Sequence, residues 1–157
     1  MTTLDARPAL STPTPIDARG PRFGAVITTA VLALVLLTLP APLAGALLTA
    51  QAVVFGIGAL AGPQAQPYGV LFRRFVRPRL AAPTRFEDPR PPRFAQAVGL
   101  GFALVGLIGL AVGAPAVTYV AVAFALAAAF LNAAFDFCLG CEMYLLGRRA
   151  LVRSDAA

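Results

Sequence analysis

Four long apolar runs divide the chain. They cover residues 23–39, 43–62, 94–113 and 116–137, and the only charged residue in them is one acid close to the end of the fourth. Each run approaches the roughly 20 residues that a helix needs to cross the hydrocarbon core of a bilayer. Short turns that contain proline separate the first run from the second and the third from the fourth. The pattern therefore predicts an all-α membrane protein with four transmembrane helices in two hairpins.

The polar segments define the remaining organisation. The first segment is rich in proline, serine and threonine and has no apolar period to bury, so it is predicted to be a disordered tail. The predicted parts are this N-terminal tail (residues 1–20), the first hairpin (21–62), a basic loop (63–93), the second hairpin (94–147) and a C-terminal tail (148–157).

The basic loop contains a short amphipathic segment. Phe72, Phe75 and Val76 share one helical face, and arginines surround the rest of the turn. Such a segment is typical of a helix that lies at the membrane surface. We expect Pro78 to end it, and an extended link to run from there to the third apolar run at Phe94. The candidate contacts for anionic lipid headgroups are Arg73, Arg74, Arg77 and Arg79.

The chain shows a weak internal repeat. Pro21-Arg22-Phe23 opens the first hairpin and Pro92-Arg93-Phe94 opens the second, and the same offset pairs Arg77 with Arg148. Each half has two helices, so both halves have the same orientation in the membrane and are parallel repeats. Every arginine falls in the leader, the central loop or the tail, and neither hairpin turn carries a charge. The positive-inside rule then predicts that both termini are cytoplasmic.

Composition agrees with a membrane location. Apolar residues make up 59% of the chain and charged residues only 13%, about half the charged share of soluble domains. All 13 basic residues are arginine, and alanine, glycine and proline are abundant, which indicates a bacterial cytoplasmic membrane. The net charge is +6, and the arginines flank the apolar runs. The expected partner is therefore anionic lipid and not nucleic acid.

Three polar residues fall within the apolar runs. Gln51 lies in the second, and Asn132 and Asp136 lie near the end of the fourth. Polar side chains that face lipid are costly, so all three are expected to face the interior of the bundle. Gln51 and Asn132 are expected to form hydrogen bonds between helices. Asp136 is a candidate functional group, or a partner for an arginine of the central loop.

Cys138 and Cys141 have the spacing of a reactive dithiol or a soft-metal ligand pair. We expect the fourth helix to continue through both cysteines toward Arg148. Arg148 then lies on the same face of the helix as the cysteines, and Asp136 lies on the opposite face. At the end of a span the helix dipole disfavours a thiolate. A new helix that began near Gly140 would reverse that effect.

Three functions stay open for the pair. The first is thiol/disulfide exchange or sulfur relay, with Cys138 and Cys141 as the reacting residues. The second is a soft-metal site for Cu(I) or Zn²⁺, which requires a homo-oligomer because one chain supplies only two of the usual four ligands. The third is packing alone, in a structural subunit of a membrane complex. The sequence identifies no cofactor and does not decide whether the protein is an enzyme.

Several segments together resemble a known family. They are Arg19-Gly20-Pro21-Arg22-Phe23, Gln51-Ala52-Val53-Val54-Phe55, Pro67-Tyr68-Gly69, Arg77-Pro78-Arg79, Glu87-Asp88-Pro89-Arg90-Pro91-Pro92-Arg93-Phe94 and Phe137-Cys138-Leu139-Gly140-Cys141-Glu142. With them the chain resembles domain of unknown function 4395, a family of mainly actinobacterial membrane proteins without an established activity. The resemblance implies a multi-span membrane protein and a soluble thioredoxin-like or sulfurtransferase partner.

Overall fold

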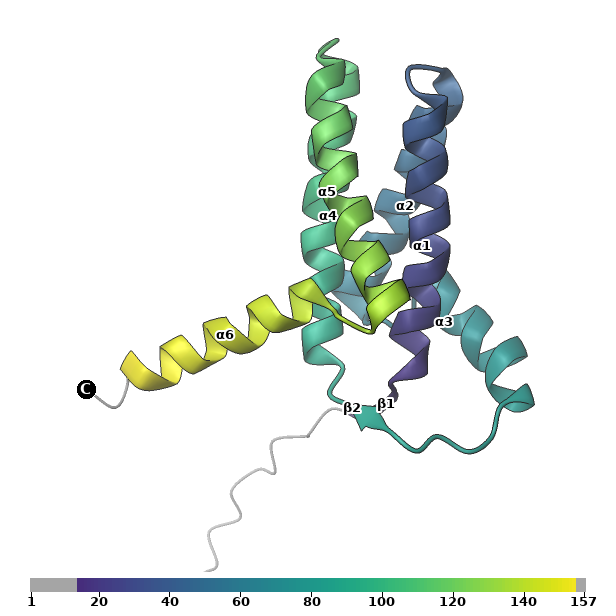
Figure 1. Ribbon diagram of the computed structural model, residues 1–157, viewed down its shortest axis with the longest axis vertical. Coiled ribbons are helices and arrows are strands. Elements are labelled where there is room, and N and C mark those ends of the chain that lie inside the picture. Colours follow the sequence, from purple (N-terminus) through teal and green to yellow (C-terminus); the bar gives the residue numbers. More distant parts are fainter. Residues whose placement is uncertain (1–13, 155–157) are drawn as a thin grey trace, which may run out of the picture.

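The computed structural model describes residues 14–154, and the parts of the two predicted tails at 1–13 and 155–157 lie outside it. The described part is mainly helical, which confirms the all-α prediction (Figure 1). Its α-helices are α1 (Arg19–Thr38), α2 (Pro42–Ala61), α3 (Pro67–Leu71), α4 (Arg90–Ala111), α5 (Pro115–Phe135) and α6 (Leu139–Ser154). A π-helical turn (Phe72–Val76), a 3-10 turn (Arg77–Arg79) and the short strands β1 (Ile16–Asp17) and β2 (Phe86–Glu87) complete it.

Four helices, α1, α2, α4 and α5, are long and apolar enough to cross a membrane. Each has 20 to 22 residues, which corresponds to about 30 Å of helix. Large apolar side chains such as Leu37 (82% exposed) and Leu60 (78% exposed) cover their outer surface, as lipid contact requires. Leu32, Leu48 and Val122 fill the interior. The protein is therefore a membrane protein with four candidate spans.

The long helices pair across the two halves of the chain. α1 packs most extensively against α5, and α4 packs most extensively against α2. The turns between α1 and α2 and between α4 and α5 lie at one end of the bundle (Figure 1). The strands, α3 and the start of α6 lie at the other end, which we call the basic end because the arginines of the described chain flank the helices there.

Two arginines cap helix ends at the basic end. Arg22 of α1 donates from Nε to the carbonyl oxygen of Ala133 in α5 at 3.1 Å. Arg93 of α4 donates to the carbonyl oxygens of Ala59, at 2.6 Å, and Leu60 in α2. The last carbonyls of a helix have no partner within the helix and form its negative end, so both contacts are favourable. Because Arg22 and Arg93 are equivalent in the repeat, each half caps the second helix of the other.

The repeat continues into the residues before these helices. Asp17 accepts from the backbone N–H of Arg19 at 3.1 Å, and Asp88 accepts from that of Arg90 at 2.8 Å. The same offset aligns α3 with the start of α6 and brings Gly69 into register with Gly140. Both halves thus consist of a capping aspartate, two long helices and a shorter helical segment.

The two strands join the beginnings of the halves. Ile16 pairs with Glu87 in an antiparallel register, and Ile16 is buried. The prediction of a disordered tail up to residue 20 was therefore wrong from Ile16 onward, because Ile16 finds an apolar site and a strand partner. The extended link to the third span is also shorter than expected. α4 already begins at Arg90, since prolines 91 and 92 fit the first turn of a helix, where the backbone N–H groups need no partner.

The fourth long helix does not continue through the cysteines, so that prediction was wrong. α5 ends at Phe135, and Asp136 adopts the left-handed conformation with φ of 55°. Aspartate is among the few side chains that tolerate this region. The N–H groups of Asp136 and Phe137 then bond back to carbonyl oxygens of α5. The chain turns, and α6 begins at Leu139 and runs sideways out of the bundle (Figure 1).

Replacement of Arg93 by methionine should remove the caps on α2. We expect a loss of about 1 kcal/mol, since these charge-assisted bonds are exposed. The measurement is thermal unfolding in detergent, followed by circular dichroism. The matched control is Arg90→Met, which removes the same charge from the same helix end without the carbonyl bonds. Equal melting temperatures of the two variants would contradict the capping role.

The carboxylates of Glu87 and Asp17, which lie in the two strands, should make the stability of the strands depend on pH in opposite directions. Burial raises the pKa of Glu87 above its ordinary 4.5, and the Arg19 side chain lowers the pKa of Asp17 below 3.8. Glu87 therefore favours the folded strands at pH values below 4.5, and this contribution is lost as the pH rises through its folded pKa. Asp17 contributes above 3.8 and loses its contribution as the pH falls.

Glu87→Gln should therefore protect the strand amides more strongly than the wild type does at neutral pH, and no more strongly below pH 4.5. Hydrogen exchange of residues 16–19, corrected for intrinsic rates, measures the effect. The exposed Glu142→Gln is the control and should leave this exchange unchanged. A Glu87→Gln effect that does not depend on pH would show that the charge of Glu87 is not its cause.

Candidate dithiol site

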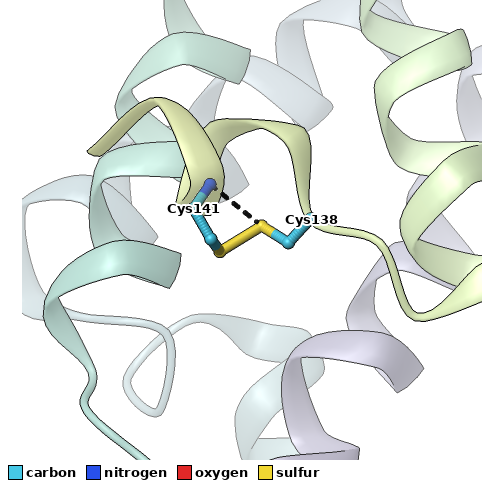
Figure 2. The surroundings of a disulfide bond; sticks show 2 residues. All are labelled: Cys138 and Cys141. Atoms are coloured by element: carbon cyan, nitrogen blue, oxygen red, sulfur yellow. Dashed lines mark hydrogen bonds between the residues drawn. A yellow bond between two sulfur atoms is a disulfide. The ribbon is translucent and has the colours of Figure 1, made fainter. Parts of the chain in front are cut away.

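The two cysteines form a disulfide where α6 begins. Cys138 lies in the connection from α5 and Cys141 lies in the first turn of α6, with 5.2 Å between their Cα atoms (Figure 2). Both residues are half-buried. The cysteines are thus placed at the basic end, between the long helices and the helix that leaves the bundle.

Cys138 caps α6. Its carbonyl oxygen accepts from the N–H of Glu142 at 3.0 Å, and its Sγ accepts from the N–H of Cys141 at 3.3 Å (Figure 2). These are the bonds that an N-cap residue makes. The expectation that the helix dipole disfavours a thiolate here was therefore wrong, because the pair opens a new helix. After reduction, the positive end of α6 favours negative charge on the Cys138 sulfur.

Gly140 fixes this helix start against α4. A Cβ atom at Gly140 would lie 2.7 Å from Cα and Cβ of Ala95, so the two helices approach as closely as a glycine allows. One turn further on, the rings of Tyr144 and Phe94 meet with centroids 5.8 Å apart. The helix break itself occurs earlier, at Asp136, and the role of Gly140 is close packing.

Asp136 does not face the bundle interior as predicted. It lies at the break between α5 and α6, and its side chain is 41% exposed. Its Oδ2 pairs with Nη1 of Arg85 at 3.1 Å, so the acid does find an arginine of the central loop. Exposed pairs of this kind contribute at most about 1 kcal/mol. Asp136 therefore connects the central loop to the break and is not a buried acid.

Gln51 bonds between segments inside the bundle. It is 1% exposed, accepts from the Tyr68 hydroxyl at 2.9 Å and lies 3.5 Å from the Thr28 hydroxyl. This agrees with the inter-helix bonding expected for it. Burial also raises the pKa of Tyr68, so its hydroxyl stays a hydrogen-bond donor throughout the physiological pH range.

A cavity of about 220 Å³ lies between the long helices and the start of α6. Most of its wall is apolar. Cys138 forms part of the wall, and the polar side chains Thr28, Gln96 and Asn132 also line it. Cys141 is not part of the wall. The structure therefore brings Cys138 and Asn132 together at one cavity, which the predicted continuous helix would not do.

Gln96 was not singled out in the sequence. Its Oε1 atom is buried and has no hydrogen-bond partner. Unpartnered buried acceptors are rare in proteins, because the lost hydration is not replaced. Its position as a polar residue near the start of the third apolar run was the available signal, by the same reasoning that selected Gln51.

The four candidate lipid-contact arginines lie together beside α3. They are Arg73, Arg74, Arg77 and Arg79, and all four are exposed. Phe72 is buried beneath them against the ring of Phe23, with centroids 5.7 Å apart. Phe75 is 50% exposed, with the Arg74 guanidinium above its ring. The segment is a short α-helix that continues into π and 3-10 turns, with Phe72 buried and Phe75 exposed.

The described residues contain no group of three or more His, Cys, Asp or Glu side chains that could hold a metal ion. Within one chain, the cysteine pair therefore supplies the only thiolate ligands, and in the disulfide neither is free.

Addition of one methyl group should distinguish the two glycines of α6. Gly140→Ala should destabilise the protein by about 1–3 kcal/mol, because the new Cβ meets the α4 backbone. Gly147→Ala is the matched control, since nothing lies near its Cβ position, and it should stabilise the helix by up to about 1 kcal/mol. Thermal unfolding measures both. If Gly140→Ala stabilises the protein as much as Gly147→Ala, the close contact with α4 does not exist.

The comparisons with known proteins give one match. The model of the family described as Domain of unknown function (DUF4395) matches residues 16–149, from β1 to the arginines of α6. No curated protein matches the chain, and no solved structure matches it. Since the matched range includes all four long helices and both cysteines, the chain belongs to the DUF4395 family.

Proposed function

We propose that this protein is a membrane-embedded component of thiol/disulfide exchange that reacts with a soluble, thioredoxin-like protein. The observation that carries the proposal is the disulfide at the positive end of a helix, half-buried at the basic end of the bundle. A dithiol at a helix N-terminus has one sulfur stabilised as a thiolate, which is what disulfide exchange requires.

The proposal includes an orientation. The turns at residues 39–41 and 112–114 carry no charge, whereas the arginines that flank the long helices lie at the opposite end. In a bacterial cytoplasmic membrane, the positive-inside rule directs such an end toward the cytoplasm. The dithiol and both termini would then be cytoplasmic. The exposed arginines beside α3 would contact anionic headgroups.

The exchange moves two electrons. A thiolate of the soluble partner attacks Cys141 Sγ, a mixed disulfide forms, and Cys138 leaves as the thiolate that α6 stabilises. The second thiol of the partner then attacks the mixed disulfide and releases Cys141. The partner dithiol is oxidised to a disulfide, the Cys138–Cys141 disulfide is reduced, and the two thiol protons of the partner balance the two new thiols.

The geometry favours exchange over the other two functions. A soft-metal site needs both thiolates free, whereas the structure joins them. Packing alone does not account for a sulfur that caps a helix and lines a cavity. Reduction by a cytoplasmic dithiol is also the usual fate of a disulfide on that side of the membrane, where stable disulfides are rare.

The test uses a thioredoxin that lacks its resolving cysteine. Incubated with the oxidised protein in detergent, it should form a mixed disulfide on Cys141, identified by peptide mass. Cys141→Ser should abolish this adduct. Full-length reduced thioredoxin should reduce the wild-type disulfide, and maleimide labelling of the released thiols counts the product. Absence of both adduct and reduction would overturn the proposal, and an adduct on Cys138 would reverse the assigned roles of the two sulfurs.

A further inference from the structure

The disulfide has a second reactive side, toward the membrane interior. Cys138 lines the 220 Å³ cavity, whereas Cys141, the residue assigned to the soluble partner, does not. A molecule in the cavity would therefore lie against Cys138, the residue whose sulfur α6 stabilises as a thiolate. The two sulfurs thus serve two different sites.

The wall of the cavity suits an apolar ligand. Phe102 and Phe124 form part of it, with their rings stacked at 19° and their centroids 6.1 Å apart. Phe124 is 61% exposed on the outer face of α5, so the wall continues to the surface that lipid covers. Pockets for drug-sized ligands usually measure about 300–1,000 Å³, so this smaller cavity suits a head group of one or two rings.

The cavity also offers a polar side chain without a partner of its own. Asn132 lines the wall and is half-buried, and its side chain makes no hydrogen bond within the described chain. An amide carries both N–H donors and a carbonyl acceptor, so it is satisfied by a ligand that brings an oxygen acceptor or an O–H donor. A hydrocarbon chain of a lipid would leave it unsatisfied, whereas a phenolic hydroxyl would not.

We propose that the cavity binds the head group of an isoprenoid quinone, which takes the electrons of the Cys138–Cys141 dithiol. This inference rests on the proposed exchange function and names its second substrate. The two thiols are oxidised to the disulfide, and the quinone is reduced to the hydroquinone. Two electrons and the two thiol protons move to the two quinone oxygens, so the reaction is balanced. The Asn132 amide donates a hydrogen bond to a quinone oxygen, and its carbonyl oxygen accepts one from a hydroquinone hydroxyl.

The experiment measures quinone reduction by the full chain in detergent. Dithiothreitol supplies electrons and decylubiquinone accepts them, and loss of the ubiquinone absorbance gives the rate. This quinone has a fully substituted ring, so thiols do not alkylate it. Reactions without protein and with the Cys138→Ser/Cys141→Ser double variant give the background rate.

Two variants test the cavity. Ala128 lines it, and Ala128→Leu should slow quinone reduction about tenfold or more by filling the space. The matched control is Ala127→Leu, at an exposed alanine of the same helix outside the wall, and it should leave the rate unchanged. Asn132→Leu keeps a side chain of similar size without the amide and should slow the reaction about tenfold.

Exchange with reduced thioredoxin is measured on every variant and reports correct folding. Retained exchange with lost quinone reduction in Ala128→Leu and Asn132→Leu supports the quinone site. Equal rates in Ala128→Leu and Ala127→Leu would overturn it, as would a wild-type rate no higher than background. Exchange without quinone reduction in the wild type would overturn the proposed quinone site and leave the proposed exchange function intact. Quinone reduction without exchange would overturn the proposed soluble partner and support the quinone site.

Discussion

The free carbonyl groups at the ends of α2 and α5 constrain the whole basic end of this protein. A bilayer offers no hydrogen bonds to a helix end, so these groups must find partners within the protein or at the interface. Arg93 and Arg22 provide them, each from the first helix of the opposite half. The contacts hold α4 beside α2 and α1 beside α5, and these are also the most extensive helix pairs. The same two side chains therefore contribute both to the termination of the helices and to the contacts between the halves.

The dithiol site depends on the way in which α5 ends. Had the helix continued, its dipole would have opposed a thiolate at the cysteines. The left-handed turn at Asp136 starts a new helix three residues later, and the same two cysteines come to lie at a positive helix end. Arg85 contacts Asp136 at this turn, and Gly140 allows α6 to lie directly on α4. One change of backbone direction thus determines both the charge preference of Cys138 and its place in the cavity wall.

The sequence predicted the parts of this fold that depend on hydrophobic length. All four long helices follow from runs of about twenty apolar residues, because a bilayer demands that length. The cysteine pair and the interior position of Gln51 also followed from the sequence. The helix break did not follow, because Asp136 and Phe137 are neither glycine nor proline. The arginine that contacts Asp136 at the turn is also distant in the sequence. The same holds for Ile16, whose strand partner Glu87 belongs to the other half, and for the cavity, which five helices enclose.

The repeat has a consequence for stoichiometry. Aligned on their capping arginines, the halves place Pro67 where the second half has Cys138, and Val70 where it has Cys141. Two identical hairpins would carry two dithiols on opposite sides of a symmetric bundle. This chain carries one disulfide, so each molecule holds a single cysteine pair and its two halves differ at this position. The first half supplies residues of α1 and α2 to a cavity whose cysteine belongs to the second half.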